Sequence, residues 1–529
     1  MKKLLLLYIL QLVSLISCSQ TNKAKIKDWH LLDFKKDGYR GISLSQAYEL
    51  LKGKKSSTVI VAVIDSGIDT LQDDLKDNFW KNPKEIPYNN IDDDKNGLVD
   101  DVTGWNFLGG VNKENLSISV SEEYRLYHRF KNEFEGKKDK NISPENKFIF
   151  EEWKKAAAII NNNYTTANKE ITDLRSNFSL TQKTNTYLIK FLAKPVFTRK
   201  DLSPGNKADS VSLCSNIWTN IFSGKDFTNT DFVKDYESYL KKQEDAIIQK
   251  TVVPTNYRDK LLNDNGYDIS KTNYGNTNLQ THSGYHGTSV SSIIGAVRNN
   301  NKGIDGIADS VKIIMIRAVL GAHEYDKDVA LAIRYAVDNG AKVINMSFAK
   351  PLSPDKKWVD EAIKYAAEKD VVLVHACGND AKNIDIDFSY PHPFYLDGTS
   401  MPNFINVGAS GDYSTGGLVG FFSNYGSKMV DVFAPGVDIN CAIANNGTQI
   451  ASGTSMASPV VAGIAALLRS YFPKLTAPEV VTIIKNSGIA INETVTLPGT
   501  EDKKIAFSKL CQTGKIVNAY QAVKLAMEK

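Results

Sequence analysis

The stretch "VIVAVIDSGID", residues 59–69, indicates the fold class. Six apolar residues in succession, five of them β-branched, are typical of a strand buried on both faces of a parallel sheet. Similar runs occupy residues 313–319, 343–346 and 371–376, and apolar residues recur at helical spacing within 329–337 and 359–366. Because strands alternate with helices, we expect an α/β fold: a parallel sheet with helices on both faces.

Length and charge restrict the protein class only loosely. The chain has 529 residues, 42% of them hydrophobic, which is enough for one large domain and a second unit, or for two to three ordinary domains. A formal net charge of +4 offers no reason to expect a nucleic-acid partner. The oligomeric state is not indicated.

The N-terminus predicts export. Residues 1–17, "MKKLLLLYILQLVSLIS", have a basic start and an apolar run too short to span a bilayer, which is typical of a signal peptide. The sequence Leu-Ile-Ser-Cys at 15–18 resembles a bacterial lipobox, which implies that Cys18 carries a lipid anchor; the alternative is an ordinary signal peptide. Residue 19 is a serine, which does not specify inner-membrane retention, so the resemblance implies the outer membrane. Residues 18–40 would form the tether.

The other four cysteines do not form a recognisable site. None belongs to a CxxC pair or has the spacing of metal ligands: Cys214, Cys377, Cys441 and Cys511. An exported protein can form disulfides, but the spacing assigns no pairing.

Residues 110–281 differ in composition from the rest of the chain. Lys, Glu, Asn and aromatic residues rise and strand-like runs almost vanish. Ser143-Pro144 resembles a helix start, and apolar residues then recur at steps of three and four up to Phe178, as in a long amphipathic helix that needs a partner. We expect an all-α insertion rather than a disordered linker, because aromatic residues are frequent.

Three blocks carry candidate catalytic residues. Asp65 follows the strand 59–64, His286 stands in "GYHGTSVSS" (284–292), and Ser455 begins an apolar helix in "SGTSMASPVVAG" (452–463). Each residue has an ordinary structural explanation when considered alone: a strand-terminal aspartate, a buried histidine and a helix cap. The chain order Asp, His, Ser is that of the subtilisin triad.

With these blocks the sequence resembles the subtilisin-like serine proteases. "VIDSGID", "HGTSVSS" and "GTSMASP" match three family motifs, "VINMSFA" (343–349) resembles the substrate-binding strand, and "VVLVHACGND" (371–380) the oxyanion-hole segment. The resemblance covers 41–109 and 282–529, and implies a peptidase domain of the subtilisin-like fold interrupted by the insertion.

The resemblance implies a serine endopeptidase acting on proteins or peptides. Ser455 would be the nucleophile, His286 the general base, and Asp65 the group that orients the histidine. Asn379 would help to bind the oxyanion. Ser347, Phe348 and Ala349 would contact the substrate.

Two functional classes remain at this stage. The first is a broad endopeptidase, within which a specialised processing peptidase or a peptide ligase would keep the same triad, and the second is an inactive protein. The protein could be a catalytically silent, membrane-tethered binding scaffold, although such a scaffold has no need of the four residues just named. Activation by prodomain removal is not expected either, because only 46 residues separate Cys18 from Asp65, and residues 29–51 resemble the leading segment of the peptidase domain. Residues 514–529 resemble its closing helix, so no further C-terminal domain is expected.

An acidic loop predicts a calcium site. In residues 89–107 oxygen ligands follow an EF-hand-like spacing, with a main-chain carbonyl expected from one residue: Asp92, Asp94, Asn96, Leu98 and Asp100. Position 12 of the pattern is Thr103 rather than Glu, and Asp101 could supply the missing carboxylate. The alternative is a solvated acidic turn.

Overall fold

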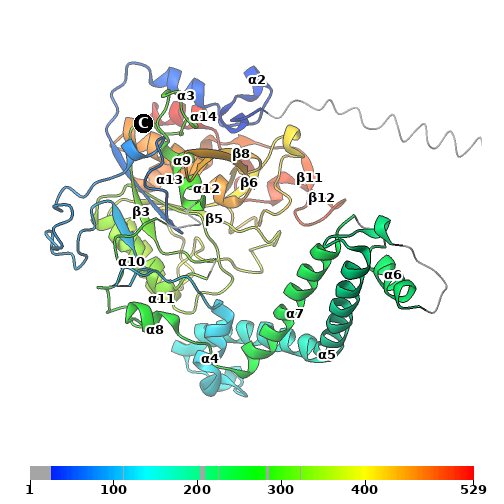
Figure 1. The fold of residues 1–529 in the computed structure, drawn as a ribbon. Helices are drawn as coiled ribbons and strands as arrows, with labels where there is room; N and C mark the ends of the chain where they lie inside the picture. Colours follow the sequence, from blue (N-terminus) through cyan, green and yellow to red (C-terminus); the bar gives the residue numbers. More distant parts are fainter. Residues whose placement is uncertain (1–25, 111, 203–208, 224–225, 281–284, 322) are drawn as a thin grey trace, which may run out of the picture. The chain divides into compact units, whose positions relative to one another are not determined.

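The computed structural model describes residues 26–110, 112–202, 209–223, 226–280, 285–321 and 323–529 (Figure 1). The predicted signal peptide and Cys18 lie outside these residues. The chain divides into two compact units: unit 1, which contains residues up to 119 and residues 257–529, and unit 2, residues 120–256.

Unit 1 is built around a nine-stranded sheet with the strand order β10-β13-β7-β6-β5-β4-β1-β3-β2. The pairs from β7 through β2 are parallel, as is β13–β7, and only β10–β13 is antiparallel. The strands are β1 Val59–Asp65, β2 Gly104–Asn106, β3 Val311–Arg317, β4 Val343–Met346, β5 Val372–Ala376, β6 Phe404–Ser410, β7 Val432–Pro435, β10 Ile489–Ala490 and β13 Lys515–Ile516.

The predicted α/β class with a mostly parallel sheet is confirmed. The four strands expected from sequence correspond to β1, β3, β4 and β5, with β3 starting and ending two residues earlier than the apolar run suggested. Strands β6 and β7 were not predicted. In β6 the apolar run is interrupted by Asn406, which is fully buried and hydrogen-bonded, and β7 is only four residues long and ends in a proline.

Helices cover both faces of the sheet, and two separate hydrophobic cores result. On one face α9 (Tyr285–Gly295) packs on β1 and β3, and α12 (Thr454–Tyr471) packs across the strands from β1 to β7. On the other face α10 (Asp326–Asp338) packs on β1 and β3, and α11 (Lys356–Glu368) on β5. The carboxyl ends of the central strands therefore share one edge, where α9 and α12 begin (Figure 1).

The remaining elements of unit 1 are peripheral. They are α2 Phe34–Asp37, α3 Leu44–Leu51, α8 Tyr257–Leu262, α13 Ala477–Ser487, α14 Ala519–Ala526, and the hairpins β8 Ile439–Ile443 with β9 Gly447–Ala451 and β11 Thr494–Thr496 with β12 Lys504–Ala506. Helices α3 and α14 pack on each other, so the two ends of unit 1 meet.

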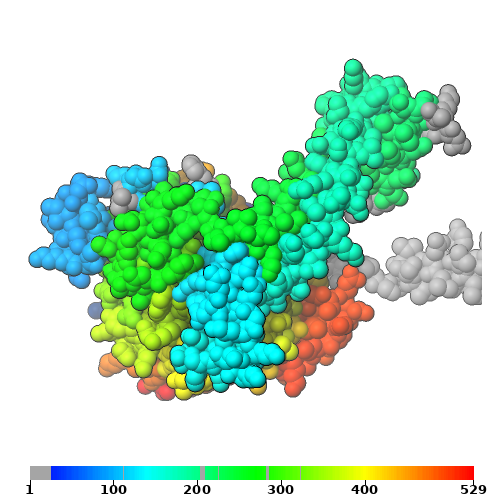
Figure 2. Space-filling view, turned by 90° about the horizontal axis from the view of Figure 1, so that it is seen from below, coloured from blue at the N-terminus to red at the C-terminus, as the bar shows by residue number. Residues whose placement is uncertain are grey.

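Unit 2 is helical. It contains α4 (Glu122–Phe134), α5 (Lys147–Leu192), α6 (Ser210–Ile221) and α7 (Asn229–Thr251). The 46-residue α5 packs against α4 near its start, α6 near its end and α7 along its length, and Figure 2 shows the cyan and green atoms of α5 and α7 in contact. The Ser143-Pro144 signal opens a 3₁₀ turn, Pro144–Asn146, and the α-helix proper begins at Lys147.

Unit 2 is shorter than the insertion expected from composition. Residues 257–280 belong to unit 1, where Arg258, Asp264 and Tyr274 are buried. The composition signal extended too far because these side chains are polar or aromatic, although they are packed inside unit 1. Among the described residues no helix is both long and apolar enough to span a membrane. The four described cysteines are buried thiols that form no disulfide with one another.

Candidate active site

Asp65 is the last residue of β1 and is buried, with 1% of its surface exposed. Its carboxylate accepts a hydrogen bond from the Ser66 backbone N–H at 2.7 Å. Its carbonyl oxygen accepts the backbone N–H groups of Ala318 and Val319 at 3.0 and 3.2 Å, just beyond β3. The end of the strand thus fixes the position and orientation of the carboxylate.

His286 lies in the first turn of α9 and contacts this carboxylate. Its Nδ1 lies 2.8 Å from one Asp65 oxygen and 3.0 Å from the other. Because a carboxylate can only accept, Nδ1 donates and the neutral ring keeps Nε2 as an acceptor. The negative charge of Asp65 raises the pKa of His286 above its usual value of 6.5, although burial acts in the opposite direction.

Gly67, just after β1, and Gly287, in the first turn of α9, allow these two elements to approach each other closely. A Cβ at Gly287 would stand 2.1 Å from the Gly67 carbonyl oxygen, so only glycine fits at this point. Next to it the Thr288 hydroxyl accepts the Asp69 backbone N–H at 2.9 Å. These contacts bring together two residues that are 221 positions apart in the sequence.

Ser455 lies in the first turn of α12, next to a small open volume. A Cβ built at Gly453 would lie 2.9 Å from Ser455 Oγ, 3.6 Å from Ser455 N and 3.6 Å from Asn379 Nδ2. One hydroxyl and two N–H donors therefore surround a single point that the missing side chain leaves open. The N-terminus of the helix adds a positive potential there.

Asn379 is oriented by the residue before Ser455. Its Oδ1 accepts the Thr454 backbone N–H at 2.9 Å and the Thr454 hydroxyl at 3.0 Å. The same Thr454 oxygen accepts the Gly378 N–H at 3.2 Å. Since Oδ1 is engaged in this way, Nδ2 is the end of the amide that faces the open volume. Thr454 was not singled out from sequence, because its role depends on a contact across 75 residues.

A cleft contains these groups and the strand expected to contact substrate. Its lining comprises Ser66, His286, Val319, Gly321, Glu324, Ser347, Phe348, Ala349, Ala376, Gly378, Asn379, Asp380, Thr454 and Ser455. The Ser347 hydroxyl is used internally, because it donates to the Ser455 carbonyl at 3.0 Å. Gly321 and Glu324 had no sequence signal, since they belong to a loop whose path depends on the tertiary fold.

This arrangement has the parts that acyl transfer needs. A histidine with an acceptor nitrogen is held by a buried carboxylate, and it shares a cleft with a serine hydroxyl beside two N–H donors. The sequence model of the subtilase family matches residues 56–508.

The chain belongs to the subtilase family. Relatives of this subtilase include the thermophilic serine proteinase of Bacillus sp. (strain AK1), 37% identical over 250 residues, and the extracellular protease of Xanthomonas campestris pv. campestris, 34% identical over 264 residues. The matches cover 47% and 46% of this chain, and 57% and 41% of those relatives. The cell wall-associated protease of Bacillus subtilis is 35% identical over 203 residues, 38% of this chain and 21% of that protein. This subtilase therefore spans less than two thirds of each of these relatives.

The acidic loop of this subtilase holds a second cluster. Carboxylate oxygens of Glu85, Asp92 and Asp94 lie within 4.8 Å of one another. Backbone N–H groups of Asn96 and Gly97 fold the loop onto Asp92 at 3.0 and 2.8 Å. Glu85 was not predicted, because it precedes the loop and belongs to no motif.

The other predicted ligands have different contacts. The Asn96 Oδ1 accepts the Leu98 N–H at 2.7 Å, and its Nδ2 donates to Asp101 at 3.2 Å. Asp101 is fully buried, accepts the Tyr335 hydroxyl at 2.7 Å, and burial raises its pKa to about 6. Asp100 accepts the backbone N–H groups of residues 89 and 90. The structure thus groups Asp92 and Asp94 with Glu85, and gives Asp100 and Asp101 hydrogen-bonding roles within the loop.

Proposed function

We propose that this subtilase is a serine endopeptidase that cleaves proteins or peptides through an acyl-enzyme. The observation that carries this proposal is the convergence at Gly453, where Ser455 Oγ, Ser455 N and Asn379 Nδ2 surround one open point, together with the cleft that Ser455, Asn379 and His286 all line. A substrate carbonyl entering that space would meet a nucleophile and two donors at once.

The proposed reaction has two stages. Ser455 Oγ bonds to the carbonyl carbon while its proton passes to His286 Nε2, and the oxyanion accepts hydrogen bonds from Asn379 Nδ2 and Ser455 N. His286 then returns that proton to the departing amine as the C–N bond breaks. In the second stage water attacks the ester, His286 takes its proton, and Ser455 leaves with the proton returned to Oγ. Asp65 stabilises the imidazolium formed in each stage.

Labelling with a fluorophosphonate tests the proposal. This probe phosphonylates only an activated serine, so we expect labelling of the parent and none of Ser455→Ala. The matched control is Ser452→Ala, three positions before Ser455. The Ser452 hydroxyl accepts the Asp438 backbone N–H, so its loss should not affect labelling. The silent-scaffold alternative predicts that the parent remains unlabelled, and that result would refute the protease proposal.

We also propose that Glu85, Asp92 and Asp94 hold a structural calcium ion. Glu85 has 6% of its surface exposed, and its Oε2 is buried without a hydrogen-bond partner among the described residues. An ionised oxygen in that position favours a cation, and an all-oxygen donor set suits calcium. The ion would offset the repulsion among three carboxylates and hold the loop folded.

For localisation we propose export followed by lipid anchoring at Cys18. The support is the N-terminal sequence, together with the printed names of two relatives, one extracellular and one cell wall-associated. Incorporation of labelled palmitate by the expressed full-length chain, lost in Cys18→Ser, is the expected result. Equal incorporation by both chains would contradict the proposal.

Unit 2 is proposed to be a helical insertion within the peptidase domain. The family model spans residues on both sides of it, and its two ends connect to segments that pack inside unit 1.

A further inference from the structure

The first turn of α10 carries three consecutive charged residues that are all buried. Asp326 has 4% of its surface exposed, and Lys327 and Asp328 have none. Each forms an ion pair with a different part of unit 1: Asp326 with Lys350 at 2.8 Å, Lys327 with Asp264 at 2.5 Å, and Asp328 with Arg258 at 2.5 Å. Buried charges are retained only when they are paired and hydrogen-bonded, so this turn is held from several sides.

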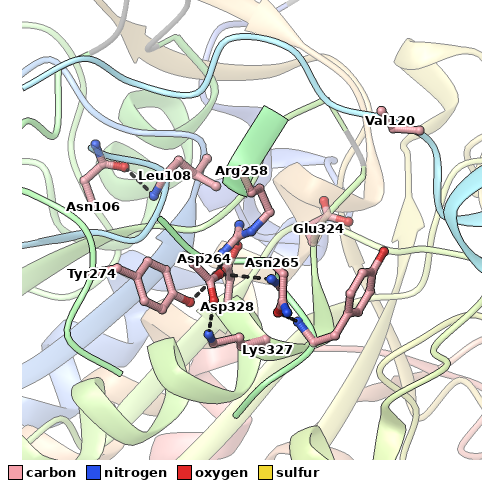
Figure 3. Close-up of polar contacts among 12 residues, drawn as sticks. Asn106, Leu108, Val120, Arg258, Asp264, Asn265, Tyr274, Glu324, Lys327 and Asp328 are labelled. Atoms are coloured by element: carbon pink, nitrogen blue, oxygen red, sulfur yellow. Dashed lines mark hydrogen bonds and ion pairs between the residues drawn. The ribbon is translucent and has the colours of Figure 1, made fainter. Parts of the chain in front are cut away.

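Arg258 contacts two of these carboxylates, those of Asp264 and Asp328 (Figure 3). Its two terminal nitrogens contact both oxygens of Asp328 at 2.5 and 2.9 Å, and Nη2 also donates to Asp264 at 2.6 Å. The Tyr274 hydroxyl donates to Asp328 from the other side. With Lys327 the cluster contains two positive and two negative side chains, each at most 1% exposed.

The turn directly follows one wall of the cleft. Val319, Gly321 and Glu324 line the cleft and belong to the loop between β3 and α10. The Glu324 carbonyl accepts the Lys350 ammonium at 3.0 Å. Arg258 also lies over the ring of Tyr325, 4.4 Å from its centroid. The carboxyl end of the cleft wall is therefore fixed on one side by Lys350 and on the other by Arg258.

We propose that Arg258 is a positioning residue for this wall, so that a peptide filling the cleft beyond the scissile bond meets a fixed surface. The inference rests on the proposed protease function. Arg258 itself is not among the residues that line the cleft. A guanidinium suits this task because its rigid fork fixes the direction of each bond, so the helix turn cannot slide or rotate.

A charge-balanced variant tests the proposal in the full chain. Arg258→Met/Asp328→Asn removes one positive and one negative charge and leaves the Lys327–Asp264 pair intact. The control is Arg469→Met/Asp370→Asn, which removes another Arg–Asp pair, 2.7 Å apart, at the opposite end of α12 from Ser455. Two peptide p-nitroanilides with the same residue at the scissile bond are compared, one with a single residue and one with four residues on the acyl side.

We expect the double variant to lose at least tenfold in kcat/KM for the four-residue substrate relative to the one-residue substrate, mainly through KM. The rate of fluorophosphonate labelling at Ser455 should stay within twofold of the parent. The control pair should affect both substrates equally. If the double variant does not fold, the single variant Arg258→Lys provides the test. Lysine keeps the positive charge but lacks the planar guanidinium, so we expect a smaller loss of kcat/KM for the four-residue substrate relative to the one-residue substrate.

Equal losses on the two substrates, or no loss on either, would overturn the positioning role while leaving the protease assignment intact. An unlabelled parent, in contrast, would overturn the proposed function itself.

Discussion

Within unit 1 several buried ion pairs lie near the cleft, whereas within unit 2 aromatic clusters make up most of the apolar interior and one buried ion pair, Glu122 with Arg125, lies in α4. Unit 1 buries ionised side chains in pairs beside the loop that lines its cleft, such as Arg258 with Asp328 and Lys327 with Asp264. Unit 2 is stabilised by two aromatic clusters, one around Trp153 and one around Trp218. Ring contacts tolerate small rotations, whereas a buried ion pair requires a defined direction. The comparison indicates that the buried ion pairs of unit 1 fix the directions of contacts near the cleft. The aromatic clusters of unit 2 instead add apolar burial along the long helix α5.

The largest expected effect is that of Ser455→Ala. We expect peptide hydrolysis to fall by about 10⁶, the order found when the nucleophile of a related enzyme is removed. Thermal unfolding of both units should be unchanged, because only one hydroxyl is lost. Steady-state kinetics with a tetrapeptide substrate and a melting curve provide the two measurements. Residual activity within tenfold of the parent would place the nucleophile elsewhere.

Two deletions test whether unit 2 is separable. Replacing residues 121–255 by a flexible linker of about 20 residues should leave Ser455 labelling intact. Deleting 115–275 instead removes Arg258, Asp264 and Tyr274, and leaves Lys327 and Asp328 buried without those partners.

Breaking a buried pair in this way costs about 3–5 kcal/mol, so the longer deletion should yield no folded protein. Solubility and labelling of the two shortened chains are compared side by side. If both behave alike, the contrast drawn between the two units is wrong.

Asn379→Ala should lower turnover by about 10²–10³, a range taken from the loss of one oxyanion donor in a relative. KM should change little, because the lost amide N–H acts on the oxyanion rather than on the bound substrate. Asp380→Asn is the matched control, since this neighbour also lines the cleft but donates nothing to the point beside Gly453. An unaltered turnover number in Asn379→Ala would remove this residue from the oxyanion site.

Chelation should affect stability more than chemistry. A metal present at a hundred times its Kd stabilises the folded state by about 2.7 kcal/mol, so EDTA should lower the Tm of unit 1 by about 3 °C. Glu85→Gln should abolish this response.

Asp100→Asn should keep the response, because Asp100 bonds only the backbone of residues 89 and 90 in this loop. A Tm insensitive to EDTA in the parent would identify the loop as a solvated turn.

The smallest effect concerns pH. His286 must be neutral to accept a proton, and the charge of Asp65 raises its pKa. Activity is therefore lost as the pH falls through the raised value, so the acid limb of kcat/KM should have its midpoint above pH 6.5. A midpoint below 6.5 would mean that burial outweighs Asp65 at this site.

Much of the site could be predicted from short segments of sequence. Asp65, His286, Ser455 and Asn379 each stand in a motif of local residues, and residues 59–64 and 343–346 are short, nearly continuous apolar runs. Glu85, Thr454 and Arg258 could not be found in this way. Their partners are Asp94, Asn379 and Asp328, and for Thr454 and Arg258 these partners lie 70 or more positions away.

The sequence by itself determined the fold class and the identity of the candidate catalytic groups, because apolar periodicity and motif chemistry are local properties. Only the tertiary structure decided where unit 2 ends, which carboxylates gather in the acidic loop, and what holds the cleft wall. Those features depend on which distant segments meet, and a buried charge such as Arg258 acquires its role only from the partners that burial brings to it.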